Sequence, residues 1–258
     1  MKHILFAGLL AAAGLFAGCD GTSEPDNGPS SDFKITFQAR YDGQPLEKYK
    51  NYPYDSYQVQ ITRFNTFLSD ITLLKGSEEV RISDINWVDF TPDNAPNNLA
   101  VSVPLTFSKV PDGDYTGIRI GYGVRPDLNA KQPKDFAAGH PLSRENEYWL
   151  GWGSYIFNKI EGTVDLDNNN VADGGLVYHC GSDATYRTYT FNVPITVGTG
   201  AAATVEFDLK KLFDSADPAG TWLDLHIPYN HVTSNDVSDV VIANLLMNKF
   251  DRATTVQQ

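Results

Sequence analysis

The stretch FKITFQAR, residues 33–40, places an apolar side chain at every second position. Because successive side chains of a β-strand point to opposite faces of a sheet, this alternation predicts a strand with one buried face. The same pattern returns in YQVQITR (57–63) and YTFNV (189–193). Five more stretches, bounded by Gly, Pro, Asn or Asp, are predicted strands: 99–107, 115–124, 148–166, 175–180 and 204–209. This spacing predicts an all-β fold, an antiparallel β-sandwich.

One short helix is expected near the C-terminus, where Asp236 stands at a possible N-cap. The apolar residues that follow recur at helical spacing: Val237, Val240, Val241, Leu245 and Phe250. We expect this helix to close one end of a sheet. Nothing from residue 33 onward resembles a linker or a repeat, so the sequence predicts one domain over residues 33–258.

The charge balance restricts the partners of the 258-residue chain. It has 20 Lys and Arg against 32 Asp and Glu, a formal net charge of −12. Such a chain has no basic face to neutralise phosphates, so we expect no nucleic-acid partner and regard cations as better ligands. Hydrophobic residues make up 41% of the chain, too many for a disordered protein. The composition therefore predicts a globular body.

The N-terminus has the three parts of a secretory signal. Lys2 and His3 precede an apolar run over residues 4–16, and two small residues then lead to Cys19. The run is shorter than the roughly 20 apolar residues that a membrane-spanning helix needs. These features predict export, with cleavage near Cys19.

The ending LFAGC (15–19) is similar to the lipobox of bacterial lipoproteins, in which cleavage leaves the cysteine first and its thiol carries lipid. We therefore expect a lipoprotein signal peptide over residues 1–18 and lipidation at Cys19, with simple secretion as the alternative. The Gly-, Pro- and Ser-rich residues that follow predict a tether over 19–32. This places the protein in a bacterial cell envelope, periplasmic or at the cell surface, held to the membrane by its N-terminal lipid.

Histidines are the main candidates for metal binding, because imidazole suits copper, zinc and nickel. Those beyond the signal segment are His140, His179, His226 and His231. His179 and Cys180 are adjacent in a predicted strand, so they point to opposite faces and cannot easily hold one ion together. Either His179 is a metal ligand or it is a hydrogen-bonded, half-buried histidine, and Cys180 can equally be a small core side chain. We expect His140 and His226 to be structural or surface residues.

Trp149 and Trp152 lie three apart in the predicted strand YWLGWGSY (148–155). Regular alternation would point them to opposite faces, so only one of them could border any one site. The alternative for both is aromatic packing in the core, which we favour for Trp149.

The segment DLDNNNVADG (165–174) has the spacing of a calcium-binding loop. Its loop positions one, three, five and nine are Asp165, Asp167, Asn169 and Asp173, and position seven supplies the carbonyl of Val171. Position twelve is Leu176 in place of the usual Glu, so we expect only modest Ca²⁺ affinity. The alternative is an Asn/Asp-rich hairpin turn.

Four stretches in order resemble the MbnP-like family of secreted copper-binding proteins. They are RFNTFLSDITLL (63–74), HPLSRENEYWLGWGSYIFNKIEG (140–162), LVYHCGSD (176–183) and NHVTSNDVSDVVIANLLMNKF (230–250). The most specific parts are the W-x-x-W segment that runs into Glu161–Gly162 and the H-x-G at His179. Two departures stand out, because many relatives have a histidine in the first strand where FQARYDG (37–43) has none, and Cys180 is unexpected.

The resemblance implies an extracytoplasmic β-sandwich that binds copper through histidines. In some relatives a tryptophan is oxidised to kynurenine by a dihaem peroxidase-like partner. Carried over to this chain, it implies a copper site with His179 and His231 as ligands and Trp152 at its border.

No enzyme signature supports catalysis: the chain has no G-x-S-x-G, no H-E-x-x-H, no phosphate loop and no dinucleotide fingerprint. We expect a non-catalytic, lipid-anchored copper protein acting in storage or delivery. The alternative is a surface lipoprotein that binds glycan or protein through an aromatic platform.

Overall fold

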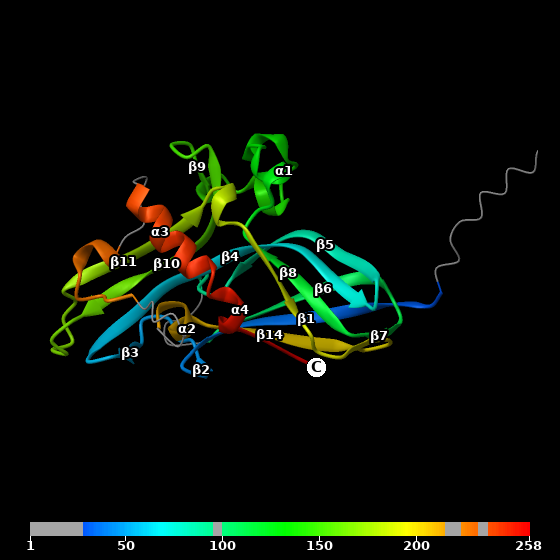
Figure 1. Cartoon of the computed structure of the whole chain (residues 1–258), viewed down its shortest axis with the longest axis horizontal. Coiled ribbons are helices and arrows are strands. Elements are labelled where there is room, and N and C mark those ends of the chain that lie inside the picture. Colours follow the sequence, from blue (N-terminus) through cyan, green and yellow to red (C-terminus); the bar gives the residue numbers. More distant parts are fainter. Residues whose placement is uncertain (1–27, 95–99, 215–222, 232–236) are drawn as a thin grey trace, which may run out of the picture.

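The computed structural model describes residues 28–94, 100–214, 223–231 and 237–258. The predicted signal peptide, Cys19 and Asp236 lie outside these residues, as do the side chains of Tyr229, His231 and residues 237–240. Two β-sheets pack face to face, and two short strands form a third, separately hydrogen-bonded pair whose apolar residues join the same core (Figure 1). The predicted all-β sandwich with a short C-terminal helix is confirmed.

The smaller sheet is built around β1 (Ser30–Tyr41). Phe33, Ile35 and Phe37 are all fully buried, as the alternation predicted. β1 begins at Ser30, so the last residues of the predicted tether already belong to this strand. Its partners are β14 (Ala202–Asp208), β6 (Ser102–Pro111) and the short β2 (Gln44–Pro45), with β15 (Thr254–Gln257) beyond β14. The β1–β14 pair is parallel and the other pairs of this sheet are antiparallel.

The larger sheet is organised by β4 (Tyr57–Lys75), a strand of 19 residues. Its first half pairs with β3 (Asn51–Tyr54) and β10 (Ser154–Asp165), and its second half with β5 (Glu78–Asp89) and β8 (Gly117–Tyr122). The outer strands are β11 (Gly174–Gly181) next to β10 and β12 (Arg187–Phe191) next to β8. The separate pair is β7 (Gly113–Tyr115) with β13 (Ile195–Val197).

The main core lies between the two sheets and centres on Phe207 of β14. Its ring stacks on Phe37 at 6.2 Å and meets the edges of Phe64 and Tyr122 at 6.3 and 6.1 Å. These rings come from both sheets, so aromatic burial holds the two layers together.

Helices close the core at the C-terminal end of the chain. They are α2 (Leu209–Phe213), α3 (Val237–Met247) and α4 (Phe250–Ala253). α3 crosses β10 and β11 in Figure 1, and its Leu246 and Met247 are fully buried in the main core. The predicted helix therefore forms and packs on the larger sheet. In the described part of the chain, no helix is long and apolar enough to cross a membrane.

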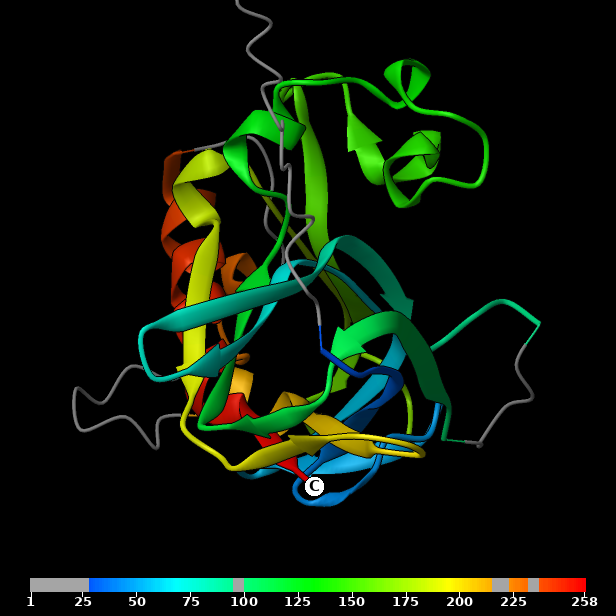
Figure 2. The ribbon, with the colours of Figure 1, turned by 90° about the vertical axis from the view of Figure 1, so that its right-hand side faces the viewer.

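Residues 125–153 form a cap over part of the other face of the larger sheet. The cap contains α1 (Pro126–Asn129), η1 (Pro133–Asp135), η2 (Pro141–Ser143), η3 (Glu145–Glu147) and β9 (Tyr148–Trp149). Figure 2 shows it in green, standing off the sheets. Beneath it a second apolar cluster forms from Phe67, Ile85, Val124, Leu128, Leu142, Tyr155 and Phe157. Residues 64–69 of β4 are buried without alternation because both faces of the strand are covered there.

The predicted strand 148–166 is a hairpin. β9 pairs with the start of β10, and residues 150–153 turn between them. The alternation argument for the two tryptophans is therefore wrong, because Trp152 lies in the turn. Their ring centroids lie 6.3 Å apart, so the two indoles are neighbours at the hairpin tip.

A candidate metal-binding face of the larger sheet

Three of the stretches that resemble the MbnP-like family meet in the larger sheet. Residues 63–74 lie on β4, the end of 140–162 lies on β10, and 176–183 lie on and after β11. Lys159 of β10 is opposite Asn65 of β4 on one side and His179 of β11 on the other. Side chains in register point to the same face, so these three strands present one continuous surface. We call this surface, which faces away from the main core, the outer face.

The imidazole of His179 is held by Glu161, its diagonal neighbour on β10. His179 Nε2 lies 2.8 Å from Glu161 Oε1, and Arg63 Nε donates to Glu161 Oε2 at 3.1 Å. The hydrogen bond to His179, together with the nearby Arg63 charge, lowers the pKa of Glu161 against the opposing effect of partial burial. Arg63 also pairs with Asp93 at 3.6 Å. A chain of charged groups therefore fixes the orientation of the His179 ring.

Trp152 lies against β11 because of a glycine. Gly181 follows His179 by two residues on β11, so both residues face the same side of the strand. A Cβ at position 181 would lie 2.9 Å from Trp152 Cζ3 and 2.7 Å from the carbonyl oxygen of Tyr155. Only glycine lets the indole lie this close to β11. The indole of Trp152 thus packs two residues along β11 from His179.

A buried ion pair lies next to this position. Lys159 Nζ is 2.9 Å from Glu147 Oε2 and donates to the carbonyl oxygen of Asn146 at 2.8 Å. Burial raises the pKa of Glu147, and the bond from Lys159 opposes that rise. Asn65, across from Lys159, is 1% exposed, and its amide atoms have no hydrogen-bond partner among the described residues. The cap thus joins the sheet through polar groups near His179.

His231 ends the short η5 helix (Pro228–His231), and its side chain lies outside the described residues. The preceding residue, Asn230, accepts a hydrogen bond from the hydroxyl of Tyr178 through its carbonyl oxygen. Tyr178 is buried in the main core, on the side of β11 opposite to His179. The pairing of His179 with His231 stays a prediction.

The remaining histidines and the cysteine have other surroundings. His140 stacks on Phe136 at 4.5 Å, and its Nδ1 accepts from the Leu142 N–H. His226 packs edge-on against Tyr57 at 4.3 Å. Cys180 is fully buried on the opposite face of β11 from His179. These residues have structural contacts of the kinds expected for them.

Glu161 and Arg63 are the residues that the sequence reading did not assign to the site. Both lie in stretches that carry the family resemblance. The missing information was the pairing of β10 with β4 and β11, which only the assembled sheet supplies.

A family model for MbnP matches residues 30–232. The chain belongs to the MbnP family. The solved structure of MbnP from Methylosinus trichosporium is similar to it with a TM-score of 0.58 and 14% identity, over 89% of this chain and 99% of that one. At this identity the likeness shows a shared fold. No curated protein sequence matches the chain.

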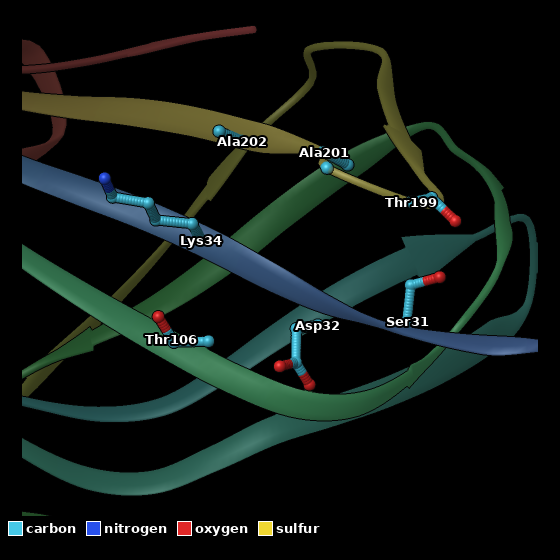
Figure 3. Close-up of a pocket in the computed structure, with 8 residues that line it drawn as sticks. Ser31, Asp32, Lys34, Thr106, Thr199, Ala201 and Ala202 are labelled. Carbon is cyan, nitrogen blue, oxygen red and sulfur yellow. The ribbon is translucent and has the colours of Figure 1, made fainter.

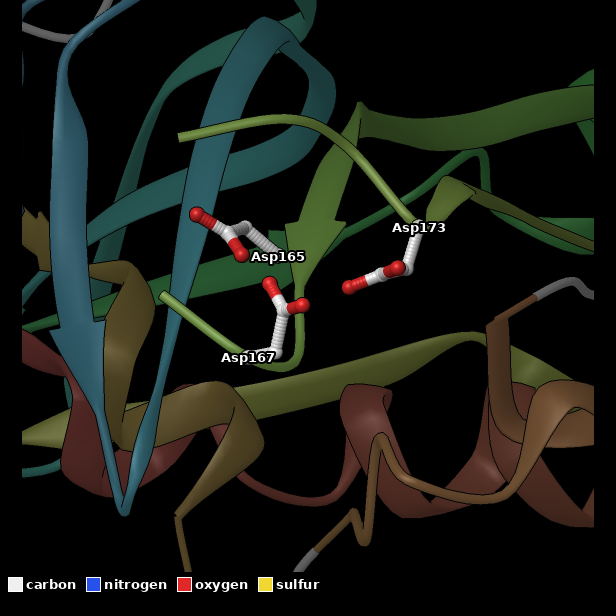
Figure 4. Close-up of side chains that lie close together, drawn as sticks. All are labelled: Asp165, Asp167 and Asp173. Atoms are coloured by element: carbon white, nitrogen blue, oxygen red, sulfur yellow. The ribbon is translucent and has the colours of Figure 1, made fainter. Parts of the chain in front are cut away.

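This MbnP-family protein also brings together the acidic loop predicted to bind calcium. Carboxylate oxygens of Asp165, Asp167 and Asp173 lie within 4.8 Å of one another (Figure 4). Asp165 accepts from the N–H groups of Asn169 and Asn170 at 3.2 and 2.7 Å, which curls the loop around the carboxylates. Three like charges at this distance repel one another unless a cation lies between them.

Further hydrogen bonds hold the rest of the loop in place. Asn169 donates its amide to Asp167 at 2.9 Å, and its Oδ1 accepts from the Val171 N–H at 2.7 Å. Asn168 Nδ2 donates to the carbonyl oxygen of Ser56 at 2.7 Å, which ties the loop to the β3–β4 turn. The loop is thus anchored at both its base and its tip.

The MbnP-family fold also has an open hollow of about 410 Å³ at the smaller sheet (Figure 3). It is lined by Ser31, Asp32, Lys34, Thr106, Thr199, Gly200, Ala201 and Ala202. None of the predicted site residues lines it.

Proposed function

We propose that this protein binds copper at the outer face of the larger sheet, with His179 as a ligand. The observation that carries the proposal is the meeting of three family stretches around an imidazole whose orientation is fixed by Glu161 at 2.8 Å. Metal-bound histidines commonly have such a carboxylate partner on the second ring nitrogen, which fixes the tautomer and raises the basicity of the ligand.

The residues present suit copper. Imidazole is a good ligand for Cu(II), which also binds nitrogen sites more tightly than the other divalent first-row metals. His231 is the proposed second ligand, and Trp152 forms the wall of the site beside Gly181. Because these groups come from separate segments, unfolding should abolish binding.

The test is titration of the protein with Cu(I) and Cu(II). We expect His179→Ala and His231→Ala each to weaken copper binding, and the double variant to abolish it. Glu161→Gln should weaken it by roughly 10–100-fold, the usual effect of losing a group behind a ligand. His226→Ala is the matched control, because His226 packs edge-on against Tyr57 and its Nδ1 lies 3.3 Å from Asp224 Oδ1, away from the residues of the proposed site. Stoichiometric copper in the double variant would refute the proposal.

The proposed role is storage or delivery of copper, without catalysis, by a protein anchored in a bacterial cell envelope through lipid on Cys19. A dihaem peroxidase-like protein is the proposed partner, acting on a tryptophan of the chain. Mass spectrometry of the native N-terminus tests the anchor, since an unmodified Cys19 or an intact Met1 contradicts it. Cys19→Ser should release the protein from the membrane.

Calcium is the second proposed ligand, at the 165–173 loop. The three carboxylates within 4.8 Å support it. Binding should stabilise the fold by RT ln(1 + [L]/Kd), about 1.4 kcal/mol at ten times Kd. Asp167→Asn should remove this effect, whereas Asp127→Asn, an exposed aspartate in the cap, should leave it unchanged. A melting temperature indifferent to millimolar Ca²⁺ and to chelator would show that the loop is only a turn.

A second candidate function rests on the tip of the β9 hairpin. Trp149 is 49% exposed and Leu150 is 83% exposed, beside a hollow of about 260 Å³ that Tyr148 and Leu150 help to line. Exposed aromatic surface of this kind favours a platform for glycan or protein. A glycan array probed with the protein and with Trp149→Ala tests it. We expect binding that the variant loses, and no binding by the unmutated protein would contradict a glycan ligand.

A further inference from the structure

Two glycines bound one stretch of the cap, residues 140–152, which runs from η2 to the turn after β9 (Figure 2). We call this stretch the strap. Gly139 before it has a φ of 87° and Gly153 after it a φ of 61°. A Cβ at either position would meet no atom within 4 Å beyond the adjoining residues, so neither glycine is packed in place. Both ends of the strap therefore have the backbone freedom of hinges.

Few groups hold the strap to the sheet. Among its residues, only Leu142 and Glu147 are buried. Over residues 140–147 of the described structure, the backbone–backbone hydrogen bonds all end within the cap, so no strand pairing fastens this part to the sheet. Side chains make the contact instead: Leu142 packs in the second apolar cluster, and the hydroxyl of Tyr155 donates to its carbonyl oxygen at 2.7 Å. The strap thus has one apolar anchor.

The polar part of this contact is poorly satisfied. Glu147 pairs with Lys159 at 2.9 Å, yet burial raises the pKa of Glu147, so its charge is less stable here than in water. Beside Lys159 in the strand register, the buried Asn65 has no hydrogen-bond partner for either atom of its side-chain amide among the described residues. Such groups are rare in folded proteins because each costs free energy. The polar end of the contact therefore works against the anchor at Leu142.

We infer that the strap is a lid over the outer face, with its hinges at the two glycines. Local opening requires least free energy where few apolar groups are buried and buried polar groups are poorly paired. When the strap opens, Asn65 and Lys159 are uncovered. Lys159 is directly opposite His179 in the strand register, so opening widens the polar surface around His179. The motion can be measured without copper and does not rest on the proposed function.

The rest of the cap is fastened differently. Asn129 of α1 accepts a hydrogen bond from the Tyr155 N–H at 2.9 Å and donates to Asp183 Oδ1 at 2.8 Å. Its buried amide is therefore paired through both its oxygen and its nitrogen, unlike that of Asn65. We expect α1 to stay docked while the strap moves.

The experiment places a thiol beneath the strap. In the full chain carrying Cys19→Ser, Asn65→Cys puts a thiol on the outer face, and Thr66→Cys puts one on the opposite face of the same strand. Both native side chains are 1% exposed, so the two positions are matched in burial. Iodoacetamide labelling of each folded variant is followed by peptide mass spectrometry, and each rate is divided by the rate of the unfolded variant.

We expect the thiol at position 65 to react roughly 100-fold faster than the one at 66, because local opening needs less free energy than global unfolding. Leu142→Ala removes the apolar anchor of the strap. It should speed labelling at 65 by roughly 30-fold, the lower limit for loss of a buried leucine, and leave labelling at 66 unchanged. This response separates opening of the strap from any effect of Lys159 on the reactivity of the thiol.

Equal normalised rates at 65 and 66, or a rate at 65 that Leu142→Ala leaves unchanged, would overturn the lid. Hydrogen exchange of the chain carrying only Cys19→Ser is the second measurement, and it needs no substitution under the strap. The N–H groups of Ser143 and Glu147 should exchange at rates that low urea concentrations do not change, as expected for local opening. Exchange of these two groups only through the same global unfolding as β4 would equally contradict the lid.

Discussion

His179 and Cys180 are neighbours in the chain and belong to different regions of the molecule. Cys180 points into the main core, where it is fully buried among apolar side chains. His179 points to the outer face, where Glu161 holds its ring, and Trp152 packs on Gly181, two residues further along β11. The pleat of β11 separates them, because successive strand residues face opposite sides. One face of the larger sheet thus packs into the apolar core, and the other carries charged and polar side chains.

The two faces also differ in how they are covered. The inner face packs against a second sheet and α3, whereas the outer face has only the 125–153 cap over part of its area. The uncovered remainder carries the charged chain from Asp93 to His179. If this contrast is correct, substitutions on the inner face should lower the free energy of unfolding more than substitutions on the outer face. Substitutions on the outer face should instead change copper binding.

The largest effect is expected at the centre of the inner face. Phe207→Ala removes a ring that contacts aromatic groups from both sheets, and burial losses of this type cost about 3–5 kcal/mol. Urea denaturation measures the loss. A loss of unfolding free energy below about 1 kcal/mol, the typical value for a point mutant, would show that Phe207 is not central to the core.

Matched leucines compare the two clusters directly. Leu142 of the cap and Leu246 of α3 are both fully buried. Leu→Ala at buried positions costs about 2–5 kcal/mol, and we expect Leu142 near the lower limit because the small cap cluster can collapse around the gap. Leu246→Ala should cost more. Equal losses in denaturation experiments would mean that the cap is as much part of the cooperative core as α3 is.

Gly181→Ala tests the close contact on the outer face. Its new Cβ would meet the backbone of Tyr155 and the ring of Trp152, and overpacking of this kind costs about 1–3 kcal/mol. We expect a shift in tryptophan fluorescence together with weaker copper binding. Gly175→Ala on the same strand is the control, because its Cβ would come no closer than 3.9 Å to any neighbour. Similar effects at both positions would separate Trp152 from the site.

The smallest expected effect is a lack of reaction at Cys180. Burial raises the pKa of this thiol to about 12, so almost none of it is thiolate at pH 8. Since alkylating reagents attack the thiolate, the folded protein should remain unlabelled and should react only after unfolding. Fast labelling of the folded Cys19→Ser chain would mean that the inner face opens readily under α3.

The strands that were predicted well are those with one buried face. β1 and β11 alternate as their sequences indicated, and Cys180 lies opposite to His179. Alternation failed where a strand is covered on both sides, as in β4, and at 148–155, where a turn replaces the expected strand. It gave no signal for β5, in which exposed and half-buried residues dominate.

The site was only partly predictable for the same reason. His179, Trp152 and the three aspartates could be chosen by residue type and spacing, because a loop such as 165–173 closes on itself over a few residues. Glu161 could not be assigned, since its contact with His179 depends on the register of two strands. The contact of Asn158 with Met247 depends on where α3 docks.

The sequence by itself determined the class of fold and the membership of the MbnP family, because alternation and motif order are properties of short segments. Only the tertiary structure decided which side chains meet. In it, the long strand β4 pairs with four other strands. Trp152 packs on Gly181, two residues along β11 from His179. The tertiary structure also brought Met247 at the end of α3 to the side chain of Asn158 on β10. Such contacts arise from strand register and helix docking over long sequence separations, and no local pattern encodes them.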